Sequence, residues 1–448
     1  MVMQNKTKSG KWKRQKFGLE SIIEKFLYNP LFRKDWKKRM NNGFYYYRMK
    51  PTVKILSLIF PTHLFRYKLN FIANSHLDAA WLWIQDDTIK RAYMTFKKAI
   101  EYIEIYPYFK FTQTSPQYYL WIKQYDPKLW SQIKKYVAEG RFELAGGMWL
   151  EPDLNVPSGE SLVRQRLYGM LFYQLNFGQM PRVESLLDVF GFPQQIPQIL
   201  VKSGADAFWT TKCTWNEFNK WPFANYLWEA QDGSRIFVHH FKIHLLTLLQ
   251  SDFYEKMARF PKKEFIGTSF SSFNTNKEIE ESFSNEVYRR LGVFYGWGDG
   301  AKGPLEIEIG AAQLAGQLGM GKFCRMDTYF DLLKKELNDR LIVWSDEMYL
   351  EYHRGCLTTQ VKTKKLHRLA ELYLNAAESL YTLINIGVKS PSKSKEISND
   401  TLFYNKAEFF EAWRKLLFNE FHDILPGSSI EDVYVIANKE LEEVIRFA

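Results

Sequence analysis

The chain has 448 residues, 46% of them hydrophobic, which is enough for a sizeable core spread over about two or three domains. Its net charge of +11 is concentrated at one end, because residues 1–70 hold 17 Lys and Arg against 3 Asp and Glu. This basic segment could contact nucleic acid or anionic lipid, or be a solvated arm. Because the rest of the chain is slightly acidic, we expect neither nucleic acid nor a membrane as partner.

The sequence also lacks the features of exported and membrane proteins. It contains no run of about 18 apolar residues, and no short apolar stretch near its start has the form of a secretory signal. Its three cysteines, Cys213, Cys324 and Cys356, are far apart. They suit neither a disulfide framework nor a Cys-x-x-Cys zinc pair, so we predict a cytoplasmic protein.

Strands and helices alternate between residues 67 and 212. Short apolar runs predict the strands, and amphipathic stretches between them predict the helices. This alternation predicts an α/β fold with a parallel sheet. The expected strands lie at 67–74, 109–116 and 141–145, at a segment ending near 186–188, and at 205–212; the expected helices lie at 86–107, 127–139, 159–178 and 193–204.

The pattern changes after about residue 360. Two long amphipathic stretches, 365–387 and 405–425, are separated by the polar linker Lys389–Asp400, which predicts a helical bundle. We therefore expect three parts: a basic N-terminal segment (1–66), an α/β domain (67–358) and a helical bundle domain (359–448).

One pair of polar side chains follows directly after a predicted strand. In "ANSHLDAAWLW", His76 and Asp78 are two residues apart, so on an extended segment both point the same way. Ligands of parallel sheets bind beyond the carboxyl ends of the strands, where this pair lies. An imidazole and a carboxylate that converge there suit a divalent metal such as zinc, or simply hydrogen-bond to each other.

Two further residues could complete such a site. Asp188, in "ESLLDVFGFPQQIPQIL", follows an apolar strand before a sharp turn, although it could instead be the N-cap of the next helix. His422, in "LLFNEFHDILPGSSI", ends a helical run, although it could instead cap the last carbonyls of that helix. The four residues form a candidate His2Asp2 set, and local spacing leaves open whether they meet.

Seven sequence blocks, in order, resemble the glycoside hydrolase family 38 alpha-mannosidases, from about Leu69 to Asp432. No single block carries the resemblance, but the ordered set is specific. The blocks are "ANSHLDAAWLW", "EGRFELAGGMWLEPDLNVPSGESLVRQRLYG", "DVFGFPQQIPQIL", "TKCTWNEFNKWPFANYLWEAQDGSRI", "YGWGDGAKGP", "DEMYLEYHRGCLTTQ" and "LLFNEFHDILPGSSI".

The resemblance implies a fold, an activity and a site. The fold would be a seven-stranded-barrel-like catalytic domain followed by the bundle. The activity would be a zinc-dependent, retaining exo-alpha-mannosidase acting on glycans or oligosaccharides, with another divalent ion as an alternative to zinc. His76, Asp78, Asp188 and His422 fall on the family's zinc ligands, and Asp188 also falls on its nucleophile. Asp299, on the glycine-rich loop, is the candidate acid/base, or else an Asx-turn residue. The candidate substrate-binding residues are Trp81, Trp83, Trp215, Tyr349, Arg354 and Asp423, although the tryptophans could equally be core residues.

The sequence departs from the family pattern in three places. The glycine-rich loop reads "GAKG", Asp346 stands where a glycine is expected, and the stretch after His240 matches poorly. The chain also ends at Ala448, where relatives continue into an all-β region. We therefore expect the bundle to be covered by self-association or by a separate β-rich chain, although residues 1–66 could instead fold over the same surface. The alternative function is an inactive or partner-dependent fragment of such an enzyme.

Overall fold

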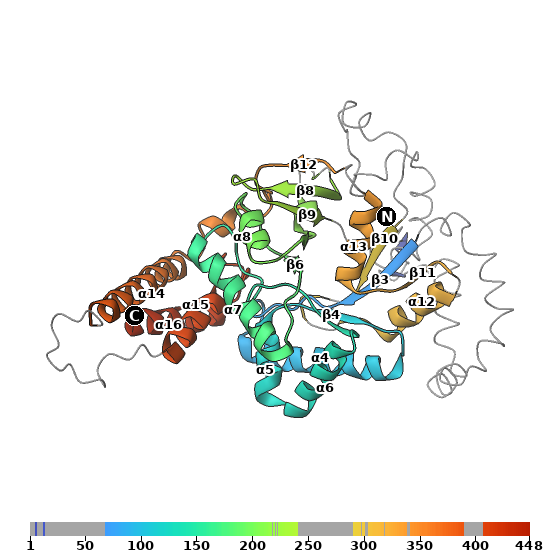
Figure 1. Ribbon diagram of the computed structural model, residues 1–448, viewed down its shortest axis with the longest axis horizontal. Helices are drawn as coiled ribbons and strands as arrows, with labels where there is room; N and C mark the ends of the chain where they lie inside the picture. Colours follow the sequence, from blue (N-terminus) through green and yellow to red (C-terminus); the bar gives the residue numbers. More distant parts are fainter. Residues whose placement is uncertain are drawn as a thin grey trace.

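A computed structural model describes residues 5–6, 12–13, 68–240, 290–388 and 406–448, apart from short gaps at 217, 220, 222, 297, 301–302, 318 and 338–340 (Figure 1). Of the predicted basic segment only a small antiparallel hairpin, β1 (Asn5–Lys6) and β2 (Trp12–Lys13), falls within this range. The rest of that segment, the linker Lys389–Asp400 and the poorly matching stretch after His240 lie outside the described residues.

A first sheet carries the opening motif. It has the order β10-β3-β4-β5, and β11 also pairs with β3, with every pairing parallel. Because β3 is buried along its length after Lys68, it reads as a continuous apolar run rather than an alternating one. The strands are β3 (Lys68–Asn74), β4 (Phe111–Gln113), β5 (Phe142–Leu144), β10 (Arg290–Tyr295) and β11 (Gly321–Phe323).

A second sheet has the order β12-β8-β9-β7-β6 and is mixed. Its β8–β9 pair is an antiparallel hairpin, which the sequence analysis did not predict, and its other pairings are parallel. The signal for the hairpin is the Asp-Gly turn, where Gly233 adopts a φ of +81°. The strands are β6 (Val183–Ser185), β7 (Ala207–Trp209), β8 (Asn225–Glu229), β9 (Arg235–His239) and β12 (Val343–Trp344).

The prediction of an α/β fold with a parallel sheet is confirmed, although the second sheet also contains an antiparallel pair. A closed barrel does not appear among the described strands, which apart from the hairpin of β1 and β2 form two open sheets. The sheets approach each other where the Gly146 amide donates to the Val183 carbonyl at 2.8 Å. One buried cluster contains residues of both sheets, and its Trp209 and Phe294 rings stack with centroids 4.0 Å apart. The two sheets therefore share an interior without closing around it.

Helices pack on the first sheet as the alternating pattern predicts. In Figure 1, α4 (Gln85–Ile105), α5 (Pro116–Tyr125) and α6 (Pro127–Ala138) lie together on one side of it. The start of α6 is fixed by Asp126, whose carboxylate accepts from the Leu129 amide at 2.9 Å, and by a proline at the first turn. Helix α7 (Gly159–Phe177) is capped by Ser158 and ends at Gly178 in the left-handed conformation.

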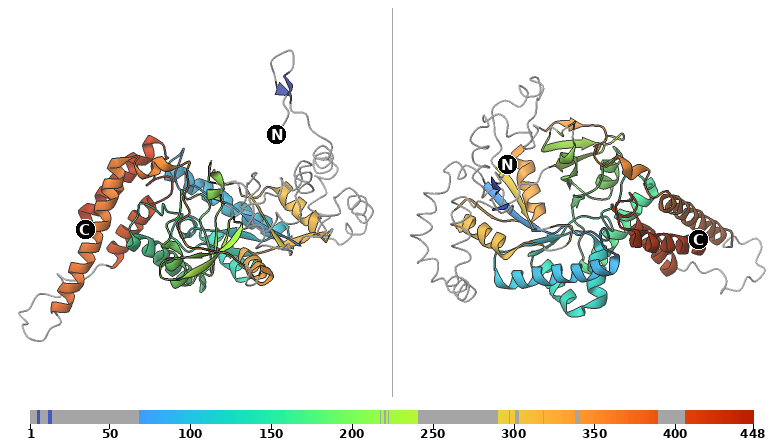
Figure 2. Two further views of the ribbon diagram at one scale, coloured as in Figure 1. Left: turned by 90° about the horizontal axis from the view of Figure 1, so that it is seen from above. Right: turned by 180° about the vertical axis from the view of Figure 1, so that it is seen from behind.

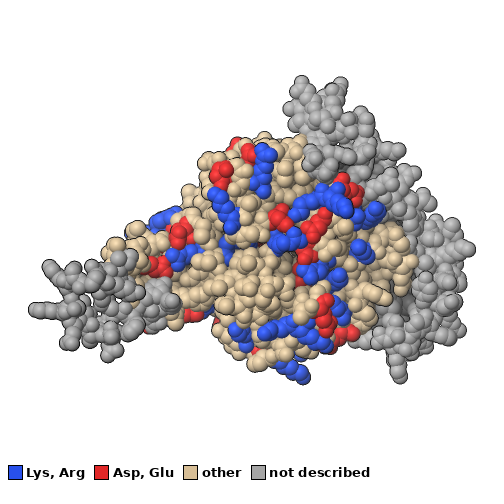
Figure 3. Space-filling view, in the orientation of Figure 1, with Lys and Arg blue, Asp and Glu red and all other residues tan. Residues whose placement is uncertain are grey.

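Three further α-helices belong to the described α/β part. These are α8 (Ile196–Lys202), α12 (Glu306–Gln317) and α13 (Met326–Leu337). Over the face drawn in Figure 3, Lys and Arg lie interspersed with Asp and Glu on the described residues.

The C-terminal part consists of α14 (Val361–Val388), α15 (Lys406–Asn419) and α16 (Glu431–Phe447), which project away from the sheets (Figures 1 and 2). Helices α14 and α15 correspond to the two predicted amphipathic stretches, whereas α16 was not predicted. All three helices contact one another. The turn between α15 and α16 runs back to the sheets, because Phe421 forms a β-bridge with Pro152.

Candidate metal and active site

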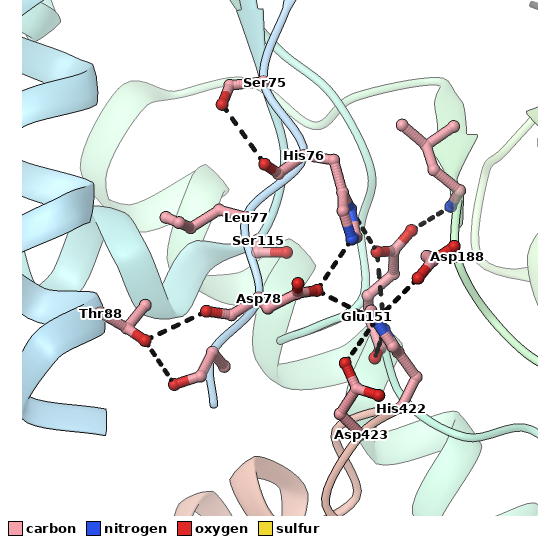
Figure 4. A network of polar contacts seen from close by, with 12 residues as sticks. Ser75, His76, Leu77, Asp78, Thr88, Ser115, Glu151, Asp188, His422 and Asp423 are labelled. Atoms are coloured by element: carbon pink, nitrogen blue, oxygen red, sulfur yellow. Dashed lines mark hydrogen bonds and ion pairs between the residues drawn. The ribbon is translucent and has the colours of Figure 1, made fainter. Parts of the chain in front are cut away.

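Four predicted ligands meet at one point. The structure brings together His76, Asp78, Asp188 and His422, each with one ligand atom within 4.8 Å of those of the others. His76 and Asp78 follow β3, Asp188 follows β6, and His422 lies in the turn after α15 (Figure 4). The carboxyl ends of two sheets and the C-terminal helices therefore converge at this site.

The contacts within this cluster are close. His76 Nε2 lies 3.0 Å from Asp78 Oδ1, and His422 Nε2 lies 3.3 Å from the same oxygen. Asp188 Oδ2 is 3.9 Å from His422 Nε2. The two imidazoles are stacked, with ring centroids 5.4 Å apart and an interplanar angle of 20°. Both Nε2 atoms therefore face one carboxylate oxygen.

The structure contains one of the three local alternatives and excludes the other two. The His76–Asp78 hydrogen bond is present, within the larger cluster. Asp188 is not a helix N-cap, because the N-cap of α8 is Gln195. His422 Nδ1 faces the Glu151 carbonyl at 3.1 Å, and not the last carbonyls of α15.

The residues of the cluster fit a divalent cation. His422 is fully buried, yet its Nε2 makes no hydrogen bond to any of the described residues, although Asp78 Oδ1 is 3.3 Å away. A buried ring nitrogen without a partner is costly unless something else uses its lone pair. Two imidazoles and two carboxylates are a donor set typical of zinc and other transition metals.

Ionisation of the cluster depends on its own members. Burial alone would lower the pKa of His76, but the carboxylates of Glu151 and Asp78 raise it well above its ordinary value. Burial likewise opposes the charge of His422, whose pKa is nevertheless raised to about 9, chiefly by its contact with Asp78. The same imidazoles hold the pKa of Asp78 well below its ordinary value, against the effect of burial. Protons and a cation therefore compete for the same lone pairs.

Sequence reasoning missed Glu151, whose side chain lies between His76 and the segment of Asp188 (Figure 4). Its Oε2 is 2.9 Å from His76 Nδ1, and its main-chain oxygen accepts from the His422 amide at 3.1 Å. The only signal for it was its place in the block "GGMWLEPDLN", where no spacing links it to a histidine.

Lys212 was also missed. It begins the short helix η2 (Lys212–Trp215) after β7, and its buried ammonium lies 2.5 Å from Asp188 Oδ1. The ammonium also lies over the rings of Phe190, at 4.8 Å, and Trp215, at 4.4 Å. The Lys212 ammonium thus lies beside Asp188, the second carboxylate of the cluster, on the side away from His422.

His353, next to the predicted Arg354, is the third missed residue. The centroid of its ring lies 4.3 Å from the centroid of the Phe190 ring, which in turn lies 5.8 Å from the centroid of the His422 ring. Burial, helped by the nearby Lys212 ammonium, lowers the pKa of His353 to about 4. Arg354 is exposed and begins the short helix η4 (Arg354–Leu357).

The glycine-rich loop after β10 brings Asp299 to the same edge. Its main-chain oxygen accepts from the Asp78 amide at 3.2 Å, and Gly300 forms a β-bridge with Leu77. Gly296 makes this approach possible, because it has a φ of +121° and any Cβ would lie 1.9 Å from the Asn74 carbonyl oxygen. Burial, together with the carboxylates of Asp78 and Asp188, raises the pKa of Asp299, although its side chain still reaches solvent.

The two tryptophans of the opening motif are half-buried and meet edge to face, with ring centroids 5.8 Å apart. Trp83 lies against α4: its indole donates to Thr88 Oγ1 at 2.9 Å, and the Arg91 guanidinium lies 4.0 Å from its ring. The main-chain oxygen of Trp81 accepts from the Ile430 amide at 2.9 Å. The indole of Trp83 thus has a structural role on α4, and that of Trp81 lies beside it.

The remaining predicted substrate residues surround the cluster unevenly. Asp423 is buried next to His422, with Oδ2 3.6 Å from Nε2, and Ser428 donates to its other oxygen. Burial raises the pKa of Asp423 to about 6, partly opposed by His422. Trp215 and Tyr349 are 56% and 45% exposed, so their side chains are free to contact a ligand.

The fold and the site together define a class: an α/β protein with a His2Asp2 cluster at the carboxyl ends of its strands. Residues 66–347 match the profile described as the Glycosyl hydrolases family 38 N-terminal domain, and residues 351–448 match the Alpha mannosidase middle domain. The chain belongs to glycosyl hydrolase family 38.

Similar proteins agree with this assignment. Alpha-mannosidase G of Dictyostelium discoideum is 35% identical over 369 residues, covering 81% of this chain and 30% of the relative. Alpha-mannosidase 2C1 of Homo sapiens is 30% identical over 382 residues, covering 85% of this chain and 34% of the relative. The chain thus spans about a third of the length of these curated relatives.

The fold is also similar to a solved structure. The crystal structure of an alpha-mannosidase from Enterococcus faecalis V583 has a TM-score of 0.63 at 19% identity, covering 85% of this chain and 41% of that one. Within the described part of the chain, no helix is both long and apolar enough to cross a bilayer.

Proposed function

We propose that the chain forms the catalytic region of a zinc-dependent, retaining exo-alpha-mannosidase that cleaves alpha-mannosidic bonds in glycans or oligosaccharides. Membership of family 38 and the names of the relatives support the activity. The observation that carries the proposal is the convergence of His76, Asp78, Asp188 and His422 from three separate segments.

The ion would be held by the two Nε2 atoms of His76 and His422 and by the carboxylates of Asp78 and Asp188. When bound there, zinc or another divalent ion would supply a Lewis acid that binds sugar hydroxyls and so orients the ring and favours its distortion toward the transition state. Nε2 of the buried His422 faces carboxylate oxygens of Asp78 and Asp188, at 3.3 and 3.9 Å, without a hydrogen bond to the described residues, which supports this assignment.

Asp188 is the proposed nucleophile. In a retaining mechanism one carboxylate attacks the anomeric carbon and forms a covalent glycosyl-enzyme, which water then hydrolyses. The Lys212 ammonium holds Asp188 Oδ1 at 2.5 Å. This contact fixes the orientation of the carboxylate and leaves Oδ2 on the side of the cluster.

Asp299 is the proposed general acid and base. A carboxyl group whose pKa is raised stays protonated closer to neutral pH, where it can donate a proton to the leaving oxygen. Its side chain reaches solvent while its main chain is fixed to Asp78. It can therefore release the leaving group and later deprotonate the attacking water.

Sugar binding is proposed for Asp423, Trp81, Trp215, Tyr349 and Arg354, and less directly for Trp83, whose indole is engaged by α4. The carboxylate of Asp423 beside His422 suits a hydroxyl, and the exposed rings suit the apolar face of a sugar. In this proposal the α/β domain (67–358) supplies the catalytic residues and the helical bundle (359–448) supplies His422 and Asp423.

A direct test is release of nitrophenol from a 4-nitrophenyl alpha-mannoside, with NMR detection of the anomer formed first. Turnover that is lost on chelation, restored by zinc and accompanied by retention of configuration would support the proposal. Hydrolysis unaffected by complete metal removal would refute the metal-dependent mechanism.

A second candidate is a region that is active only when another surface covers its C-terminal helices. Large apolar side chains are exposed along α14, at Leu372, Leu380, Leu383 and Ile384. Exposed apolar patches of this kind mark interaction sites. We propose either self-association or a separate β-rich chain as the cover. Light scattering after size exclusion detects self-association, and rescue of activity by an added β-rich chain detects the second alternative. Cytoplasmic localisation stays a prediction, which the free state of all three buried cysteines supports.

A further inference from the structure

Glu151 contacts two of the four candidate ligands and the segment that carries a third. Its Oε2 lies 2.9 Å from His76 Nδ1. Its main-chain oxygen accepts from both the amide and the Nδ1 of His422, each at 3.1 Å. Its Oε1 accepts from the amide of Leu187, the residue before Asp188. One residue thus joins the segments after β3, β6 and α15.

These contacts engage Nδ1 of each ring and so turn Nε2 toward the cluster. When Nδ1–H of a neutral imidazole donates a hydrogen bond, Nε2 carries the lone pair. The side chain of Glu151 faces Nδ1 of His76, and its main chain faces Nδ1 of His422. Both rings therefore present Nε2 to the centre of the cluster, where each lies within 3.3 Å of Asp78 Oδ1.

Glu151 is itself held rigidly. It is 5% exposed, and the residues after it are tied to the turn that carries His422. Pro152 forms a β-bridge with Phe421, and the Asp153 amide donates to the Glu420 carbonyl at 2.7 Å. The position of its carboxylate is therefore fixed by the protein backbone.

We propose that Glu151 is a positioning residue that presets both histidines for the metal, through its side chain on His76 and its main chain on His422. This inference rests on the proposed function of the His2Asp2 cluster. Carboxylates that accept from the second nitrogen of a metal-bound histidine fix its orientation and raise its basicity, and their loss weakens metal binding about 10–100-fold.

The test compares Glu151→Gln and Glu151→Ala with the wild-type chain. Zinc affinity is measured by competition with a chromophoric chelator, and site geometry by the visible spectrum of the cobalt(II)-loaded protein. The amide oxygen of glutamine can still accept from His76 Nδ1, so Glu151→Gln should bind zinc about tenfold more weakly, and Glu151→Ala about a hundredfold more weakly. The glutamine variant should also keep a spectrum closer to wild type.

A matched control is Glu143→Gln. Glu143 is another buried carboxylate that accepts from main-chain amides, those of Met326 and Asp327, outside the cluster. The Glu143→Gln substitution should lower the melting temperature of the metal-free protein without changing its affinity for zinc. If zinc affinity is unchanged in both Glu151 variants, or if Glu143→Gln lowers it equally, the positioning role of Glu151 is refuted while the metal site itself still stands. A wild-type chain that binds no zinc would overturn the metal site, and this inference with it.

Discussion

Replacing His422 by alanine tests whether the C-terminal helices supply a metal ligand. The imidazole is fully buried, and its Nε2 lies 3.3 Å from Asp78 and 3.9 Å from Asp188. Its removal leaves three ligands, of which His76 and Asp78 belong to one short segment. We therefore expect zinc to bind much more weakly while the α/β part stays folded.

The size of this effect can be estimated. Four-ligand zinc sites bind with about 10–16 kcal/mol, so one ligand contributes about 3 kcal/mol, or roughly a hundredfold in Kd. At a zinc concentration about 100 times the wild-type Kd, binding stabilises the wild type by about 2.7 kcal/mol. At that concentration the variant would have zinc near its own Kd and gain only about 0.4 kcal/mol.

The assay is a pair of thermal melts for each protein, with zinc and with a chelator. The wild type should gain a few degrees on zinc addition, and His422→Ala should gain almost nothing. His239→Ala is the control for loss of a buried ring: His239 is 3% exposed and contacts Asn225 at 2.7 Å, outside the cluster. It should melt earlier but keep the full zinc-induced shift. A full shift and full zinc stoichiometry in His422→Ala would refute the assignment.

Other parts of the proposal give further predictions. Asp188→Ala should abolish turnover of every substrate because no glycosyl-enzyme can form, and an aryl mannoside with a good leaving group that is still turned over would contradict this. Asp299→Ala should slow natural linkages far more than such aryl mannosides, which need little protonation. Because the pKa of Asp299 is raised, wild-type activity on natural linkages should fall as pH rises through that pKa, and the pH–rate profile of the variant should lack this limb. Arg166→Met should cost about 3–5 kcal/mol in urea unfolding, because it leaves Glu184, 2.6 Å away and 1% exposed, as an unpaired buried charge. The isolated chain should either self-associate through the exposed face of α14 or stay inactive until a β-rich chain covers that face, and light scattering that shows a fully active monomer would argue against a required cover.

Local sequence pattern accounts for much of the fold. The apolar run that ends at Asn74 forms β3, and the periodic stretch after it forms α4. These elements follow from periodicity, because apolar side chains must share one face of a helix or be buried on a strand. The hairpin of β8 and β9 was missed, because its turn signal is short and its strands lie within an aromatic-rich stretch with little alternation.

The sequence by itself determined the ligand types and the direction of one pair. His76 and Asp78 are two residues apart just beyond a strand, so their side chains had to share one side of the chain. Only the tertiary structure decided that Asp188 and His422 join them, because His422 reaches the cluster through the bridge between Phe421 and Pro152, from a distant helix. Such contacts depend on how whole elements pack, and the spacing of residues along the sequence does not predict them.

The same reason explains the residues that sequence analysis did not find. Lys212 and Glu151 act on Asp188 and His76 across gaps that carry no periodic signal. Residue type limited what these side chains could do: a carboxylate accepts and an ammonium donates. Which partner each one meets was decided by how the two sheets and the turn after α15 pack around the cluster.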